Sequence, residues 1–229
     1  MSETGPQPEL MRALSRLVRG LALLFWGLPL TLVVSVQTAR THLLAPLGML
    51  PPILANAILL YGLFQIGQFQ RQEAVWRHAL DRLKLLALVN LGLAPFLYWW
   101  KILPHVAHYR LAVAVLALSG LLFVVNLNLA LQRLAAMLPD ETLRLETRMF
   151  TTMNLYLLLA TLLVVTFWTL LGNWQPLPPW LVPSLRFLER TGLVFLLLLL
   201  LLPIALTMTL LWKIKEVVLA SVFAPGTRS

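Results

Sequence analysis

The amino-acid sequence predicts an all-α integral membrane protein, a polytopic bundle of six transmembrane helices. Hydrophobic residues make up 59% of the 229 residues and charged residues only 12%, whereas about 25% of a soluble domain is typically charged. Several uncharged stretches reach about twenty residues, which is the length that crosses a bilayer as a helix. The 18 Lys and Arg residues stand singly around the ends of these stretches, a distribution that favours membrane anchoring.

The six spans are bounded by charged and helix-breaking residues. Arg19 precedes the first uncharged stretch. The second is predicted to begin near Pro52, because paired prolines are tolerated only in the first turn of a helix; residues 43–50 are then an interfacial or broken-helix segment. The third ends in the aromatic anchor Tyr98–Lys101, whose lysine can reach the membrane surface. The predicted spans are residues 20–39, 52–70, 85–103, 111–132, 149–172 and 191–212.

Three polar segments flank these spans. Residues 1–18 form an N-terminal segment, in which Pro6 and Pro8 argue against an early helix. Residues 71–84 form a charged connector with helical spacing, expected to lie on the membrane surface. Residues 213–229 form a C-terminal tail, in which Lys213–Phe223 is expected to continue as an interfacial helix.

The distribution of basic residues predicts the topology. With the N-terminus inside, 13 of the 18 Lys and Arg residues fall in inner segments, as the positive-inside rule requires. Both termini are therefore expected in the cytoplasm. Compact loops without glycosylation sequons suggest a bacterial inner membrane.

A weak internal repeat is visible along the chain. Lys84 and Arg148, which open the third and fifth spans, are 64 residues apart. Three tandem helical hairpins of similar length would explain this spacing. Any three hairpins of similar length would also look alike, so this alternative stays open.

Polar residues recur at one depth inside five of the spans. Each lies about six residues from a flanking charge, or roughly 9 Å at the helical rise. They are predicted to lie in the cytoplasmic third as structural glue, since amides bond across membrane helices for about 0.6 kcal/mol each; the alternative is a polar pocket or pore lining open to the cytoplasm. Asn126 and Asn128 are two residues apart and cannot share a helix face. This polar set comprises Gln65, Asn90, Asn126, Asn128, Asn154 and Thr207.

Several kinds of chemistry lack the residues they need. No Asp, Glu, Lys, Arg or His lies in the middle of a span, which argues against ion- or proton-driven transport. The chain has no cysteine, so disulfides and thiolate metal sites are excluded. His105 and His108 stand at i, i+3 but are weak metal candidates, because zinc sites usually need three or four protein ligands. No phosphate loop, nucleophile elbow or zinc-protease motif occurs, and no cofactor is predicted.

These observations predict a non-enzymatic subunit or assembly partner of a membrane complex. Its expected partners are the lipid bilayer and other membrane subunits or a second copy. Nucleic acid is not expected, because no basic block is interleaved with aromatic residues. The alternative is a small channel or transporter that uses the polar set, and a more distant one is a lipid-modifying enzyme that uses His105 and His108. The residues identify no family.

Overall fold

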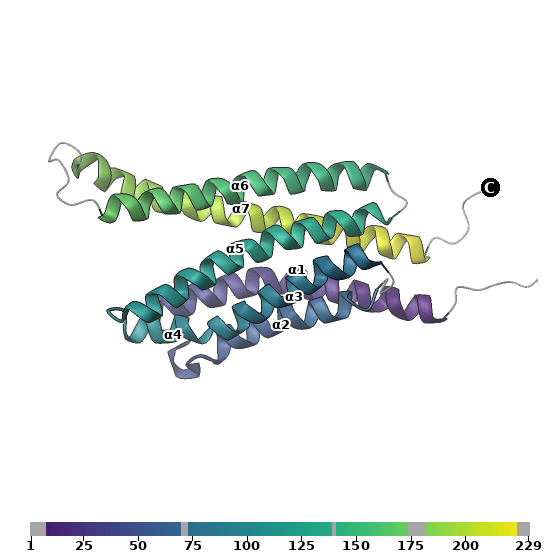
Figure 1. Ribbon diagram of the computed structural model, residues 1–229, viewed down its shortest axis with the longest axis horizontal. Helices are drawn as coiled ribbons and strands as arrows, with labels where there is room; N and C mark the ends of the chain where they lie inside the picture. Colours follow the sequence, from purple (N-terminus) through teal and green to yellow (C-terminus); the bar gives the residue numbers. More distant parts are fainter. Residues whose placement is uncertain (1–7, 70–72, 139–140, 174–181, 224–229) are drawn as a thin grey trace, which may run out of the picture.

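The computed structural model describes residues 8–69, 73–138, 141–173 and 182–223 of the chain. Within these ranges every regular element is a helix, and the helices run roughly along the long axis of the molecule (Figure 1). The elements are α1 (Pro8–Arg40), the short 3-10 helix η1 (Ala45–Leu47), α2 (Leu50–Ile66), α3 (Ala74–Leu93), α4 (Pro95–Ile102), α5 (Ala107–Ala136), α6 (Glu141–Asn173) and α7 (Val182–Phe223). The predicted all-α membrane-type bundle is confirmed.

Five segments are long and apolar enough to cross a membrane. They are Met11–Arg40, Ala74–Ile102, Ala107–Ala136, Glu141–Phe167 and Leu198–Ala220. The helix in the predicted second span, α2, is apolar but has only 17 residues. Its length of roughly 25 Å at 1.5 Å per residue is less than the roughly 30 Å hydrocarbon core. Five long spans and one short apolar helix therefore stand where six spans are predicted.

Most helices extend beyond the predicted spans. Helix α1 already begins at Pro8, because the missing N–H of a proline has no helical partner in the first turn. Helix α3 begins at Ala74 and ends at Leu93, so residues 74–84 of the predicted surface connector and the first part of the third span form one continuous helix. Helix α7 runs on to Phe223, as expected for the start of the tail. The uncharged stretch of a sequence predicts only the part of a helix that lipid covers. The helical backbone hydrogen bonds continue into the charged residues on either side.

Prolines and one glycine determine where the helices are interrupted. Helix α2 begins at Leu50, two residues before the predicted start, with Pro51 and Pro52 in its first turn. The preceding segment contains η1 and ends at Gly48, whose φ of 59° is a left-handed conformation that glycine adopts without strain. The third span is divided at Pro95, where α3 gives way to α4.

Consecutive spans pair as three antiparallel hairpins. The Arg16 guanidinium of α1 donates to the Gln68 side chain just beyond α2. Arg133 near the end of α5 donates to the Val75 carbonyl at the start of α3, 3.0 Å away. The α6–α7 hairpin packs against α1 and α5 (Figure 1). This arrangement matches the tandem-hairpin prediction, while the repeat in the sequence stays a prediction.

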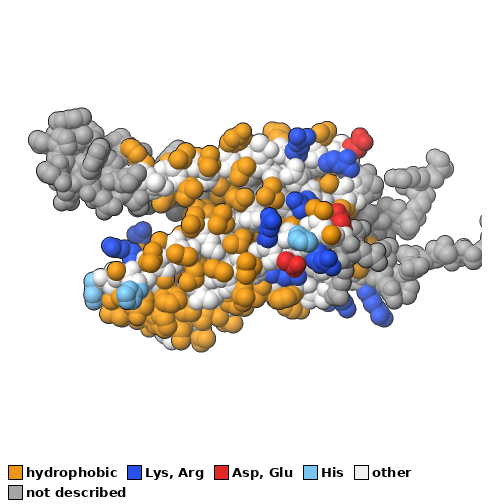
Figure 2. Space-filling view, in the orientation of Figure 1, with side chains coloured by type: hydrophobic (Ala, Val, Ile, Leu, Met, Phe, Trp, Pro, Cys, Tyr) orange, Lys and Arg blue, Asp and Glu red, His pale blue; other side chains and the backbone are white. Residues whose placement is uncertain are grey.

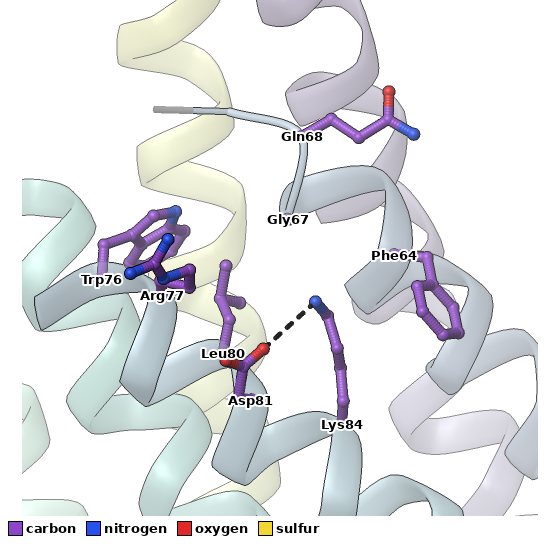
Figure 3. A pocket seen from close by; sticks show the side chains of 8 residues that line it. All are labelled: Phe64, Gly67, Gln68, Trp76, Arg77, Leu80, Asp81 and Lys84. Carbon is purple, nitrogen blue, oxygen red and sulfur yellow. Dashed lines mark ion pairs between the residues drawn. The ribbon is translucent and has the colours of Figure 1, made fainter. Parts of the chain in front are cut away.

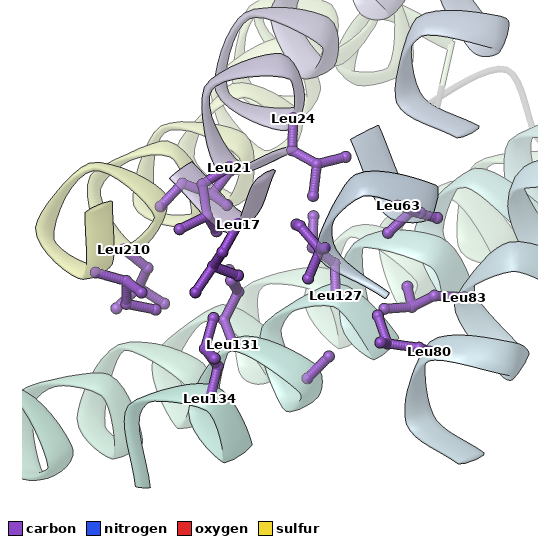
Figure 4. Packing of buried hydrophobic residues seen from close by; sticks show 14 of the residues in the cluster. Leu17, Leu21, Leu24, Leu63, Leu80, Leu83, Leu127, Leu131, Leu134 and Leu210 are labelled. Carbon is purple, nitrogen blue, oxygen red and sulfur yellow. The ribbon is translucent and has the colours of Figure 1, made fainter. Parts of the chain in front are cut away.

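The core is a leucine cluster around α1. Leu17, Leu21 and Leu24 lie on one face of α1 and are fully buried. Figure 4 shows leucines of α2, α3, α5 and α7 converging on them. Burial of each such side chain stabilises the fold by about 1.5–3 kcal/mol in water, and between lipid-covered helices the close packing itself is the main contribution.

Helices α1 and α2 approach closely through glycines. A Cβ atom built on Gly20 would stand 2.8 Å from the Gly62 carbonyl oxygen, and one built on Gly62 would stand 3.3 Å from the Gly20 carbonyl oxygen. A Cβ on Gly27 would stand 2.8 Å from the Leu59 side chain. Small residues at membrane helix contacts allow two backbones to meet, so these positions define the α1–α2 contact.

Charged side chains gather at the two ends of the bundle. Figure 2 shows a hydrophobic middle, with Lys and Arg beside Asp and Glu at the end where α1 begins and α7 ends. The histidines His105 and His108 precede or open α5 at the other end. The distribution is that of a membrane-spanning bundle with two polar ends.

Candidate functional site

Three members of the polar set meet in the core. Asn128 of α5, Asn154 of α6 and Thr207 of α7 are 2%, 0% and 0% exposed. The Nδ2 atoms of Asn128 and Asn154 donate to the Thr207 hydroxyl, at 2.8 and 2.9 Å. We call these three residues the amide cluster. It joins three helices at one point of the interior.

Every donor hydrogen of the amide cluster has an acceptor. The Thr207 hydroxyl donates to the Pro203 carbonyl oxygen at 2.8 Å and accepts from both amides, which uses its one hydrogen and two lone pairs. The Asn154 amide also donates to the Pro203 carbonyl at 3.1 Å, and the Asn128 amide to the Val124 carbonyl at 2.8 Å. Flipping either amide would set oxygen against oxygen, so these contacts fix both orientations.

The amide oxygens are different. Among the described residues, Oδ1 of Asn128 and Oδ1 of Asn154 are buried without a hydrogen-bond partner. Such an acceptor can receive a hydrogen bond, but an amide neither ionises nor attacks as a nucleophile in acid–base or covalent catalysis. The amide cluster therefore supplies hydrogen bonds but no acid, base or nucleophile.

A proline explains a second contact between α6 and α7. Pro203 lies inside α7 and has no N–H, so the Leu199 carbonyl lacks its usual partner. The Thr161 hydroxyl of α6 shares its one hydrogen between this carbonyl at 3.2 Å and the Leu157 carbonyl of its own helix at 2.8 Å. Hydroxyls of neighbouring helices make prolines tolerable in membrane spans in this way. Sequence reasoning missed Thr161; a proline inside an apolar span was the available signal.

The other members of the polar set stand apart from the amide cluster. Asn126 donates to the Leu122 carbonyl of its own helix at 2.8 Å, so Asn128 is the one of the pair that points inward. Gln65 donates to the Tyr61 hydroxyl, also on its own helix, at 2.7 Å. Asn90 is buried in α3, and among the described residues its Oδ1 has no partner. The predicted layer thus contains one three-helix cluster and three separate side chains.

The two histidines are surface residues. His105 lies in the turn between α4 and α5, His108 lies in the first turn of α5, and both are exposed. Within the described part of the chain, no three His, Cys, Asp or Glu side chains gather as a metal site would require.

Three surface pockets lie toward the end of the bundle where α1 begins and α7 ends. The first, of about 320 Å³, lies between the end of α2 and the start of α3 (Figure 3). The second, of about 210 Å³, lies beside the ion pair between Lys213 and Glu146, whose atoms are 2.5 Å apart. The third is a shallow groove of about 480 Å³ on α6. None of these three pockets is lined by a member of the polar set.

The groove on α6 has an unusual composition for a lipid-facing surface. Leu145, Met149 and Tyr156 are 71%, 69% and 67% exposed, and the Thr152 hydroxyl and the Arg148 side chain lie beside them. The Thr152 hydroxyl donates to the Arg148 carbonyl at 2.9 Å. We call this surface the α6 outer face; it comprises Leu145, Arg148, Met149, Thr152, Met153 and Tyr156.

The neighbouring helix presents a contrasting surface. Residues 196–202 of α7 are seven consecutive leucines, and the exposed side chains in the described part of this run are Leu198, Leu201 and Leu202. These purely aliphatic side chains suit lipid contact. The comparison with known proteins adds no assignment: no protein-family model, curated protein or solved structure matches this chain.

Proposed function

We propose that this chain is a non-enzymatic subunit or assembly partner of a membrane complex. The observation that carries the proposal is the α6 outer face, which presents methionine, tyrosine and threonine outward within the candidate membrane span Glu141–Phe167. The partner is another membrane subunit or a second copy of the chain. The proposed location is the bacterial inner membrane with both termini in the cytoplasm, supported by the bias of basic residues.

The exposed phenol of Tyr156 is the strongest part of this argument. Tyr156 lies eight residues after Arg148 on the same helix, or roughly 12 Å further along the axis. Among the described residues, its hydroxyl has no hydrogen-bond partner in the structure. A polar group left unpaired in hydrocarbon costs several kcal/mol. A partner helix that offers an acceptor removes this cost.

The side chains around Tyr156 support the same conclusion. Tyrosine, methionine and arginine are enriched in protein–protein interfaces, and methionine adapts its shape to a partner surface. Met149, Met153 and Arg148 surround the shallow groove on α6. The leucines of α7 offer none of these features, so the two surfaces suit different neighbours.

Photo-crosslinking distinguishes the two surfaces. A photoreactive residue at position 156 is expected to yield a discrete protein–protein adduct, whereas one at position 201 is expected to yield lipid adducts. The antiparallel pairing of Asn154 with Thr207 places position 156 level with the exposed Ala205, about four residues or roughly 6 Å away from the depth of position 201, so a third photoreactive residue at position 205 controls for depth. Lipid adducts alone at both positions would overturn the proposal.

Co-purification measures how much the α6 outer face contributes. Purification in a mild detergent is expected to isolate a stoichiometric partner, and Tyr156→Ala is expected to weaken its retention about tenfold, because aromatic anchors at interfaces commonly contribute more than 1 kcal/mol. Leu201→Ala is the matched control and should retain the partner. A single monodisperse protein that moves solutes in liposomes would contradict the proposal.

The alternative is a small channel or transporter with a cytoplasm-facing polar pocket. The unpartnered amide oxygens of Asn128, Asn154 and Asn90 favour it, because buried acceptors are suited to bind a hydrogen-bond donor. Its test is solute flux in liposomes. Flux that Asn154→Leu abolishes at a normal level of folded protein would support this alternative, and loss of folded protein would support the structural role.

A further inference from the structure

A charged groove lies where α2 ends and α3 begins. Figure 3 shows Arg77 and Asp81 on one side, with Lys84 and Phe64 on the other. The groove has a volume of about 320 Å³, at the lower end of the roughly 300–1,000 Å³ typical of small-molecule sites. It is the most enclosed of the three pockets described above.

The charges in the groove come from one face of α3. Arg77, Asp81 and Lys84 stand at i, i+4 and i+7, so they line up along the helix. The Lys84 Nζ atom is 3.6 Å from Asp81 Oδ1 and 5.5 Å from the centre of the Phe64 ring. Among the described residues, Arg77 has no ion-pair partner. The groove therefore keeps one uncompensated positive charge.

An apolar surface continues from the groove toward the middle of the bundle. Leu85 and Leu88 follow Lys84 on α3 and are exposed, and Phe64 is exposed on α2. Lys84 itself is the last charged residue before this apolar stretch of α3. The groove thus joins a cationic end to an apolar surface, which is the complement of a molecule with an anionic head and an apolar tail.

Gly67 makes room for the lysine. A Cβ atom on Gly67 would stand 3.2 Å from Lys84 Nζ and 3.4 Å from its Cε. The Lys84 side chain therefore lies directly over the Gly67 backbone. This close approach places the ammonium group at the groove, with Asp81 orienting it.

We propose that this groove binds the phosphate group of an anionic phospholipid. Arg77 and Lys84 hold the phosphate oxygens by charge-assisted hydrogen bonds, and Asp81 is a positioning residue for Lys84. The acyl chains lie along Leu85 and Leu88. A free phosphate shares the headgroup chemistry but lacks the apolar part, so the two sources can be separated. This site does not depend on the proposed function.

Native mass spectrometry of the full chain in an uncharged detergent tests the site. Phosphatidylglycerol, phosphatidylcholine and inorganic phosphate are titrated separately. Phosphatidylglycerol is expected to bind most tightly, and Arg77→Gln to weaken it about fivefold, the effect of one basic residue near an anionic lipid surface. Gly67→Leu fills the groove while keeping every charge and is expected to abolish the preference for phosphatidylglycerol.

Arg82→Gln is the matched control, because Arg82 is an exposed residue of α3 that does not line the groove. It should bind phosphatidylglycerol as the unmodified chain does. If Arg77→Gln and Arg82→Gln weaken the binding of phosphatidylglycerol equally, the lipid is attracted by the overall positive charge and not by the groove, and the proposal is overturned. Equal binding of inorganic phosphate would overturn the lipid assignment. Thermal unfolding of each variant shows whether the variant still folds. A variant that unfolds at the temperature of the unmodified chain but binds phosphatidylglycerol more weakly has lost the site and not the fold.

Discussion

Gly20→Ala is expected to lower the free energy of unfolding by about 3 kcal/mol, at the upper end of the range for overpacked cores. The added Cβ would stand 2.6 Å from Ile66 Cγ1 and 2.8 Å from the Gly62 carbonyl oxygen. Ile66 is buried, and a backbone oxygen cannot rotate away as a side chain can. Helices α1 and α2 must therefore separate. Thermal or denaturant unfolding in detergent measures the effect.

Two other glycines serve as controls for this prediction. A Cβ on Gly92 or on Gly120 meets nothing within 4 Å. Alanine at either position should leave stability unchanged or raise it by up to about 1 kcal/mol, since glycine is the poorer helix former. Equal destabilisation by all three substitutions would show that the α1–α2 contact is not the cause.

Thr207→Val should destabilise the protein by at least about 3 kcal/mol. Valine keeps the shape of threonine but removes the hydroxyl that accepts from both Asn128 and Asn154. Two interhelical bonds, at about 0.6 kcal/mol each, are lost. Each buried amide also keeps a donor without its acceptor, and an unsatisfied buried group costs about 1–3 kcal/mol.

Thr209→Val is the matched control two residues further along α7. The Thr209 hydroxyl is exposed and donates only to the Ala205 carbonyl of its own helix, at 2.9 Å. Its replacement should change stability by less than about 0.5 kcal/mol, as for most surface substitutions. If both valine variants unfold alike, hydroxyl loss in general and not the amide cluster determines the effect.

Sequence reasoning works best where one physical quantity decides the outcome. Long uncharged stretches predict membrane helices because charge is costly in hydrocarbon, and five of the six predicted spans are long enough in the structure. The ends of helices are harder to predict. Nothing in the composition of residues 74–84 separates a surface helix from the first turns of α3, because both need the same alternation of polar and apolar residues.

The end of the helix in the second predicted span was also not predictable from composition. Counting from Arg71 places Gln65 at the depth of the other polar residues, but α2 already ends at Ile66. Gln65 therefore lies in the last turn of its helix and bonds to Tyr61. Depth can be counted along a sequence only when the helix continues to the reference charge.

The sequence predicts how deep the residues of the amide cluster lie along their helices. It does not predict in which direction their side chains point around each helix axis. Asn154 and Thr207 each lie six residues from a flanking charge and do meet. The sequence also excludes a common face for Asn126 and Asn128, but only packing against α6 and α7 determines that Asn128 faces inward. The Thr161 contact with Leu199 depends on how α6 and α7 are aligned, and a single sequence does not contain that alignment.

The central claim is that the amide cluster is an interhelical structural contact. A double-mutant cycle with Asn154→Leu and Thr207→Val tests it most directly, because the two side chains bond at 2.9 Å. If the contact is structural, the coupling free energy in unfolding is expected to be at least about 0.5 kcal/mol, as for residues in one hydrogen-bond network. Additive effects, with a coupling of about zero, would contradict it.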